Sequence, residues 1–179
     1  TGRPRGPAGG TPAGLMPTAL PFPPLMASLR TLLESAAPVV VLDAASSLVQ
    51  VGVLRTDGTS RWETSAEESN RAVFECCERL SIVPANVGAW LYCDGPGSIL
   101  GIRTVAMALR TWQVLHPRPI HGYCSLAVVA HAGGNRDVSV VADARRETWH
   151  CYQRGLGLRR VAAGELAPPL VTPEHFRHW

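Results

Sequence analysis

Two aspartates stand at matching places in the sequence, each at the end of a mostly apolar run and directly before a short turn. Asp43 follows residues 39–42, and Asp143 follows residues 139–142. Carboxylates at the ends of two strands that face each other could surround a metal ion and the phosphates of a nucleotide. The alternative is that each aspartate only accepts hydrogen bonds from the N–H groups of its own turn.

The two turns differ in the size of their residues. After Asp43 come two alanines and Ser46, which are small enough to let the backbone approach a phosphate. The turn after Asp143 contains Arg145 and Arg146, whose bulk occupies the place that a phosphate would need. The first turn therefore suits a nucleotide, and the second does not.

Gly95, Pro96, Gly97 and Ser98 form the most distinctive turn in the chain. Two glycines around a proline predict a tight backbone, and Ser98 can cap a following helix by accepting a hydrogen bond from a backbone N–H group. The free N–H groups at such a helix start could also bind an anion. Both interpretations, a capped turn and an anion site, stay open at this point.

The composition excludes several kinds of catalysis. All 17 residues counted as Lys or Arg are arginine, which rules out a P-loop and Schiff-base catalysis because both need lysine. The six histidines form no HExxH pair and no cluster with cysteine, and no G-x-S-x-G motif supports a serine nucleophile or a peptidase. We therefore expect no catalytic residue, no metal site and no cofactor. The net charge of +3 is too small for a protein that holds nucleic acid by itself.

The apolar pattern predicts the elements that must position these residues. Residues 1–37 are predicted to be a leader before the first strand. Its first 24 residues hold seven prolines and five glycines, which predicts disorder, and residues 25–36 are predicted to form a short helix. Later elements are strands over 39–43, 48–54 and 59–64, a helix over 66–80, a strand over 87–93, a helix over 100–115 and a short strand over 118–121. This order is that of a ribonuclease-H-like half-domain over residues 38–122.

The same strand pattern begins again about 100 residues later. Residues 139–144 repeat residues 39–44, both ending in Asp-Ala, and residues 148–154 lie over 48–54. Such a repeat is typical of a fold built from two related halves. We predict a second half-domain over 123–179 that is truncated after its opening strands.

Two further features bear on location. No apolar run approaches the roughly 18 to 20 residues that span a membrane, so we expect no membrane association. The five cysteines form no CxxC pair, which favours reduced, buried thiols in a cytoplasmic protein.

Four segments resemble, in order, the motifs of the bacterial TsaB family, also called YeaZ. Residues 42–46 are similar to the family's LDT-[AS] strand end, and residues 93–103 to its GRGPGSFTGLR turn and helix. Residues 122–126 are similar to its GVSSL segment, and residues 143–149 to its DARRGEVY hairpin. Order and spacing match over roughly residues 38–160, which makes the combination more specific than any single motif.

The resemblance implies an actin-like ATPase fold, also called ASKHA, in which two ribonuclease-H-like halves face each other across a nucleotide cleft. It further implies that the protein is a non-catalytic scaffold in the complex that makes threonylcarbamoyladenosine at position 37 of tRNA. Weak nucleotide binding by an actin-like ATPase domain is the alternative. The cleft positions would be Asp43, Ser46, Gly95, Pro96, Gly97, Ser98, Asp143, Arg145 and Arg146.

The implied partners are a TsaD-like paralogue, which transfers the carbamoyl group, and a TsaE-like ATPase, with tRNA reached only through the complex. Family members also form homodimers through the helices of the first half, here 66–80 and 100–115. The second of these helices carries small residues at spacings of three or four, which permits close helix packing. The expected partner surface consists of Glu68, Arg71, Glu75, Gly101, Arg103, Thr104, Ala108 and Thr111.

Overall fold

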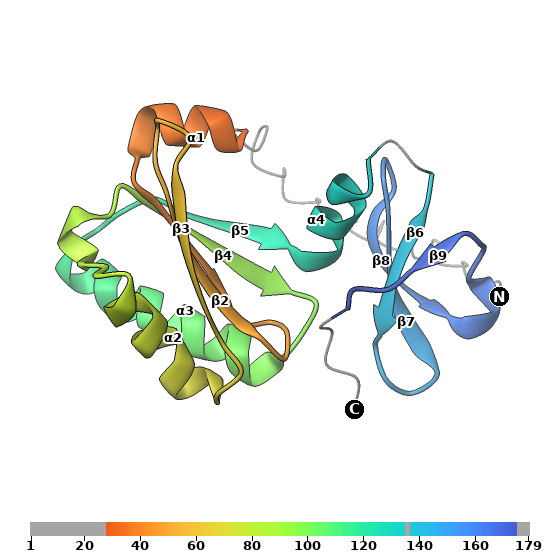
Figure 1. Cartoon of the computed structure of the whole chain (residues 1–179). Coiled ribbons are helices and arrows are strands. Elements are labelled where there is room, and N and C mark those ends of the chain that lie inside the picture. The colour runs from red at the N-terminus through yellow and green to blue at the C-terminus, as the bar shows by residue number, and fades with distance from the viewer. Residues whose placement is uncertain (1–27, 135–136, 175–179) are drawn as a thin grey trace, which may run out of the picture.

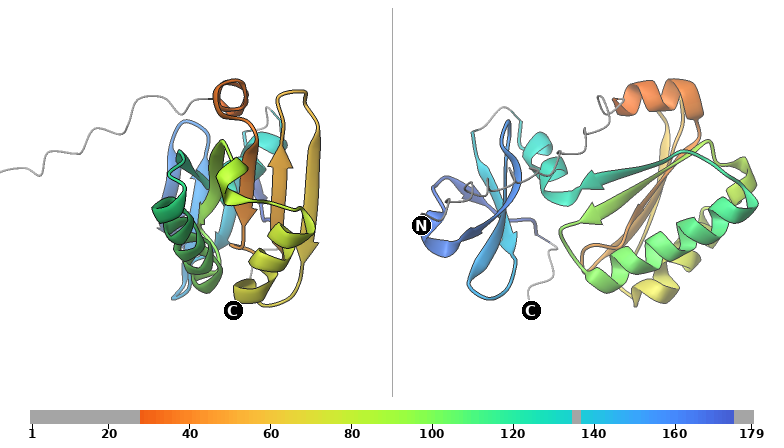
Figure 2. Two further views of the ribbon diagram at one scale, coloured as in Figure 1. Left: turned by 90° about the vertical axis from the view of Figure 1, so that its left-hand side faces the viewer. Right: turned by 180° about the vertical axis from the view of Figure 1, so that it is seen from behind.

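Two β-sheets organise the part of the chain that the structure, a computed structural model, describes, residues 28–134 and 137–174 (Figure 1). Figure 1 and Figure 2 show two α/β units side by side, with helix α4 (Ser125–Ala132) between their sheets. The leader predicted over residues 1–24 lies outside the described residues. Among the described residues, no helix combines the length and the apolar character that crossing a bilayer requires.

The first unit is a five-stranded sheet with the order β3-β2-β1-β4-β5. Its antiparallel part consists of β1 (Val39–Asp43), β2 (Val49–Leu54) and β3 (Ser60–Ser65). The strands β4 (Ala89–Gly95) and β5 (Ile120–Cys124) run parallel to β1. Parallel neighbours need crossover connections, which pass through α2 (Ser69–Arg79) with the short helix η1 (Pro84–Asn86), and through α3 (Ile99–Leu115).

Helices α2 and α3 cover one side of this sheet. Alternate strand residues such as Val40 and Leu42 lie in one buried cluster with Val73 of α2. In the same cluster Trp90 is fully buried and stacks on Trp112 of α3, with ring centroids 4.7 Å apart. Side chains on one face recur every two positions in a strand and about every 3.6 positions in a helix, so the apolar side chains of the sheet and of the helices face each other.

Helix α1 (Leu29–Ala36) covers one end of the opposite side of the sheet. The hydroxyl of Ser28 caps it by accepting a hydrogen bond from the N–H of Thr31 at 3.2 Å. Leu32 then packs against Val39 and Ala89. The helix predicted over 25–36 is confirmed from Leu29 onward.

The second unit repeats the strand order of the first. Its sheet has the order β8-β7-β6-β9, which matches β3-β2-β1-β4 and confirms the duplicated hairpin. The antiparallel strands are β6 (Ser139–Asp143), β7 (Thr148–Gln153) and β8 (Gly157–Ala162), and β9 (Leu170–Val171) is parallel to β6. Between β8 and β9 lies the three-residue helix η2 (Ala163–Glu165), where the first unit has α2. The truncation of this half stays a prediction.

Several elements differ by one to three residues from their predicted bounds, and among the strands β5, predicted over 118–121, is shifted most. Strand β5 begins at Ile120, opposite Trp90, rather than at 118. Proline has no N–H group to donate to a ladder, and Pro119 contributes only its carbonyl, which accepts from the N–H of Trp90 at 2.9 Å. The half-domain boundary predicted at 122 therefore falls inside β5, directly before α4.

All five cysteines are free, and four of them are buried. Burial raises the pKa of Cys76 and Cys93, and it raises the pKa of Cys77 to about 12. A thiol in the unfolded chain has a pKa of about 8.5. The folded chain therefore keeps thiol protons that the unfolded chain releases at alkaline pH.

We predict that the free energy of unfolding is highest below about pH 8.5 and falls as the pH rises, by roughly 1 kcal/mol per pH unit for each such thiol. Urea unfolding between about pH 8 and pH 10 measures this fall. Cys77→Ala should reduce the fall, whereas Val83→Ala, which changes an exposed side chain, should leave it unchanged. An equal fall in Cys77→Ala and in the parent would contradict the assignment.

Candidate functional site

The Asp43 carboxylate at the end of β1 is bound within the chain. Its Oδ1 atom accepts a hydrogen bond from the N–H of Ala45 at 2.9 Å. Its Oδ2 atom accepts one from the hydroxyl of Tyr123, at the end of β5, at 2.7 Å. Burial, followed by the charge of Asp43, raises the pKa of Tyr123, so this hydroxyl stays protonated and donates. Burial and then Asp43 raise the pKa of the Cys93 thiol in the same way.

The turn after Asp43 also satisfies its own polar groups. The hydroxyl of Ser46 donates to the carbonyl of Leu48 at 2.7 Å and accepts from the N–H of Leu48 at 3.2 Å. Ala44 and Ala45 are buried. The hydroxyl and the carboxylate that a nucleotide would use are thus already engaged in local hydrogen bonds.

The Gly95–Ser98 turn packs directly on this first turn. The N–H of Ser98 donates to the carbonyl of Ala45 at 2.6 Å. A side chain at Gly97 would collide with the same carbonyl, and one at Gly101 would collide with the carbonyl of Ala44. Both glycines therefore serve the close approach of two backbone segments.

Ser98 caps α3 as predicted, since its hydroxyl accepts a hydrogen bond from the N–H of Gly101 at 3.3 Å. Gly95 has a φ of 117°, which an L side chain rarely adopts. The tight strand-to-helix turn expected from the sequence is confirmed.

The second hairpin uses its aspartate in the same local way. Oδ1 of Asp143 accepts a hydrogen bond from the N–H of Arg145 at 2.7 Å, as Asp43 does from Ala45. Arg145, Arg146 and Glu147 all have positive φ, between 53° and 63°. Both aspartates therefore cap their turns, which was the alternative left open by the sequence.

Arg160 of β8 binds the outside of this hairpin. Its guanidinium donates to the hydroxyl of Thr148 at 2.8 Å and to the carbonyl of Ala144 at 2.8 Å. Burial, followed by the charge of Arg160, lowers the pKa of His150 on β7, which favours its neutral form. The exposed side chains at the tip are those of Arg145, Arg146 and Glu147.

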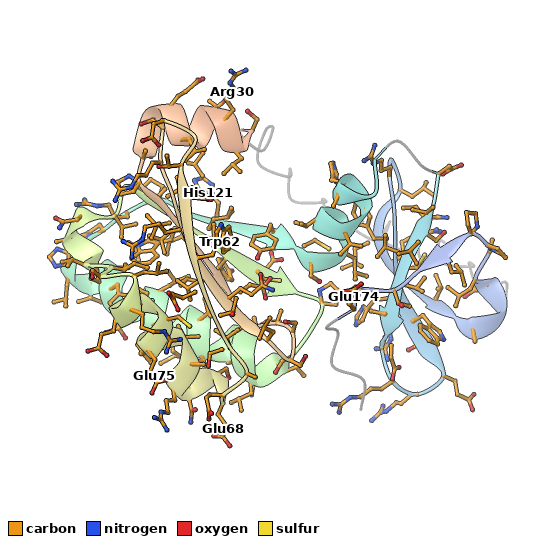
Figure 3. The ribbon with its side chains drawn as sticks, in the orientation of Figure 1. Arg30, Trp62, Glu68, Glu75, His121 and Glu174 are labelled. Atoms are coloured by element: carbon orange, nitrogen blue, oxygen red, sulfur yellow. The ribbon has the colours of Figure 1, made fainter. Side chains whose placement is uncertain are left out.

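A cavity of about 790 Å³ lies between the first sheet, α4 and the residues after β9. Of the predicted cleft residues, Asp43, Ser46 and Pro96 line it, and Asp143, Arg145 and Arg146 are absent from its walls. Figure 3 shows Trp62 on the first sheet and Glu174 beside the second unit, and both side chains line the cavity.

Sequence reasoning did not place the lining residues Tyr123, Ser125 and Trp62 among the cleft residues. Tyr123 and Ser125 lie in the 122–126 segment, so a signal for them was present. The hydroxyl of Ser125 donates to the carbonyl of Pro96 at 2.8 Å and ties α4 to the first unit. For Trp62, the only signal in the sequence was the alternation of side chains between the two faces of the predicted strand over 59–64.

Four polar side chains of this site have partners within the described residues: Asp43, Ser46, Tyr123 and Ser125. Within the described residues, no three His, Cys, Asp or Glu side chains gather where they could hold a metal ion. Ser98 is buried under its helix, and the raised pKa of Cys93 keeps its thiol in the weakly nucleophilic protonated form. The hydrogen bonds of this site position the backbone of the two turns, and the one from Ser125 to Pro96 joins α4 to the first unit.

The expected partner surface divides between the inside and the outside of the molecule. Gly101 and Ala108 are buried, so the stripe of small residues packs inside the unit at these two positions. Thr104 is half-buried, with its hydroxyl donating to the carbonyl of Leu100 at 3.0 Å. Arg103 and Thr111 are exposed on α3.

The residues expected on α2 lie on the outer side of that helix. Figure 3 labels Glu68 and Glu75 there, and Arg71 is paired with Glu75 one turn away. With Phe74 they line a shallow hollow of about 610 Å³ along the helix. Phe74 is exposed and meets Trp112 of α3 edge to face, with ring centroids 6.3 Å apart.

The chain has the actin-like ATPase class of fold. This class is defined by two sheets that each open with the same hairpin, are covered by helices and have a cavity between them. Comparison with solved structures agrees. The chain is similar to YeaZ from Pseudomonas aeruginosa, with a TM-score of 0.55 and 20% identity over 73% of this chain and 69% of that one. A second structure, an uncharacterized protein with similarity to peptidase YeaZ from the same organism, gives 0.56 and 20% over equal shares.

No protein-family model matches the sequence, and no curated protein matches it. At 20% identity the likeness to YeaZ shows the fold. The resemblance stated from the four motifs is thus confirmed at the level of fold.

We predict that Gly101→Ala destabilises the protein although alanine is the better helix former by about 1 kcal/mol. The added methyl group would collide with the carbonyl of Ala44, and such crowding costs about 1 to 3 kcal/mol. The matched control is Gly133→Ala at the end of α4, where the added atom would lie 3.6 Å from its nearest neighbour. Urea unfolding compares the two, and a Gly101→Ala protein as stable as its parent would refute the contact.

Proposed function

We propose that this chain is a TsaB-like accessory subunit that supports a TsaD-like transferase in forming threonylcarbamoyladenosine at position 37 of tRNA. The observation that carries the proposal is the coincidence of four YeaZ-like motifs, in order, with a YeaZ-like fold. The role in the complex comes from the resemblance, which also brings in a TsaE-like ATPase and tRNA.

The engagement of the cleft residues supports a role without catalysis. Asp43 is bound by Tyr123 and Ala45, and Ser46 is bound within its own turn. A nucleotide would have to break these hydrogen bonds, and each carboxylate or hydroxyl left unpaired in a partly buried site costs free energy. Side chains committed in this way fit a scaffold better than an ATPase.

The outer face of α3 supports a contact with a partner. Met107 is 62% exposed and Val114 is 81% exposed, and both lie on one helical stripe with Arg103, which is exposed one turn before Met107. Phe74 of α2 is a further exposed apolar side chain of the first unit. Exposed apolar patches bounded by charged residues are typical of protein interfaces, and a TsaD-like paralogue or a second copy of this chain would cover this one.

Co-expression with the TsaD-like protein of the same cell tests the proposal. The double variant Met107→Arg/Val114→Arg should lower the amount of co-purified partner by about ten-fold, because buried apolar anchors dominate such interfaces. Leu158→Arg, at a position on β8 that is 45% exposed, is the control and should retain the partner. Threonylcarbamoyladenosine in tRNA, measured by mass spectrometry, should fall in parallel. Full binding and modification in the double variant would reject this surface.

Nucleotide binding is tested separately by calorimetric titration with Mg-ATP. We expect no binding heat up to about 1 mM, which corresponds to an affinity weaker than about 4 kcal/mol. Binding that is lost in Asp43→Asn would instead establish the alternative, an actin-like ATPase domain.

A further inference from the structure

The cavity of about 790 Å³ beside α4 is apolar on most of its wall and carries charge of one sign only. Leu91 of the first sheet and Val129 of α4 are among its apolar residues. Its charged side chains are those of Asp43 and Glu174, and no arginine or histidine of the described residues lines it. Ligand cavities are typically apolar, with a few polar groups that select the ligand. These walls repel a phosphate and attract a cation.

Trp62 offers this cavity one flat aromatic face. Three atoms of its six-membered ring would lie 2.6 to 2.7 Å from a side-chain atom added at Gly52, the residue opposite on β2, so the ring lies flat over that glycine. Its Nε1 donates to the hydroxyl of Ser60 at 3.3 Å, which holds the ring in this orientation. Trp62 is 46% exposed and lines the cavity, so the second face of the ring is open to an occupant.

Neither carboxylate of the cavity is paired with a cation of the described chain. Asp43 accepts hydrogen bonds from the N–H of Ala45 and from the hydroxyl of Tyr123, and both donors are neutral groups. Glu174 comes from the residues after β9 and lies across the cavity wall from the first sheet (Figure 3). The ion pairs within residues 28–134 and 137–174 involve neither of these two side chains. A cation in the cavity would supply the counter-charge.

The hydroxyl groups of the wall narrow the kind of cation. Those of Ser46 and Ser125 donate to backbone carbonyls, and that of Tyr123 donates to Asp43. A primary ammonium brings three N–H donors, each of which needs an acceptor, whereas a quaternary ammonium brings none. A quaternary ammonium therefore places its charge among mostly apolar walls without leaving a donor unpaired.

We propose that this cavity binds an organic cation, a quaternary ammonium group on an apolar body, with the ammonium on the open face of Trp62 and in the field of the Asp43 and Glu174 carboxylates. Tryptophan is the aromatic side chain that attracts cations most strongly, and aromatic faces are a recurrent means of binding quaternary ammonium groups. The apolar body of the ligand would contact the leucine and valine side chains of the sheet and of α4.

This site is separate from the proposed partner surface. Val41 lines the cavity, whereas its neighbours Val40 and Leu42 belong to the cluster that packs against α2 and α3. Neighbouring residues of a strand point to opposite faces of the sheet, so the cavity and the outer face of α3 lie on different sides of the first unit. The inference therefore does not depend on the proposed tRNA function.

A nuclear magnetic resonance titration of the full 179-residue chain with benzyltrimethylammonium tests the proposal. The Nε1–H signal of Trp62, identified by its loss in Trp62→Leu, should shift together with the amide signals of Val128 and Val129, which line the cavity. The shifts should saturate with a Kd of about 1 mM, as expected for a ligand of this size. The amide signal of Phe74, on the α2 side of the sheet, should stay in place.

Two variants separate the aromatic ring from the charge. Trp62→Leu should weaken binding about ten-fold, because leucine keeps an apolar side chain but has no aromatic face. Glu174→Gln should weaken it about three-fold and should leave the binding of neutral benzyl alcohol unchanged, because only the cation feels the lost charge. The matched control Glu78→Gln removes the same charge from the hollow along α2 and should leave both ligands unaffected.

Three results would overturn the proposal. The first is the absence of a saturable shift up to about 20 mM benzyltrimethylammonium. The second is an affinity in Trp62→Leu or in Glu174→Gln equal to that of the parent. The third is binding of phenylacetate, an anion of similar size, as tightly as the cation. Each leaves the Met107→Arg/Val114→Arg test unaffected, because that test measures a partner on α3.

Discussion

The close contact between the turn after β1 and the start of α3 is the constraint on which the first unit depends. Ser98 donates its N–H to the carbonyl of Ala45, and Gly97 and Gly101 leave no room for side chains against Ala45 and Ala44. The contact sets how close α3 lies to β1, and through α3 it sets the stacking of Trp112 on Trp90. Small residues are required on both sides because backbone atoms cannot move aside as flexible side chains can.

Because of this contact, the motif residues have a structural role in this chain. In an ATPase, small residues and glycines around such turns leave space for phosphate. Here the same residues bring two backbone segments together, and the polar side chains nearby bind one another. Asp43 joins β1 to β5 through Tyr123, and Ser125 joins α4 to the Gly95–Ser98 turn. A chain can therefore keep the motifs of a nucleotide cleft while using them for folding and for joining its two units.

The repeated hairpin shows how one local pattern acquires two environments. Asp43 and Asp143 each accept a hydrogen bond from the N–H two residues further on. In the first unit, Tyr123 of β5, the strand beyond β4, also donates to the second carboxylate oxygen of Asp43. In the second unit the hairpin tip is held instead by Arg160 from β8, and its own arginines are exposed. Local hydrogen bonding is thus repeated, whereas the contacts across the sheet are specific to each unit.

The sequence alone determined the elements, the duplicated hairpin, the cap at Ser98 and the resemblance to a two-unit fold, because these follow from apolar periodicity, turn chemistry and motif spacing within short stretches. It also identified the Gly95–Ser98 turn as a distinctive feature. Only the tertiary structure decided that Gly101 and Ala108 face inward, that Tyr123 binds Asp43, and that Trp62 lies open on Gly52. These contacts join residues far apart in the chain, and their geometry depends on strand order and helix rotation, which local patterns do not specify.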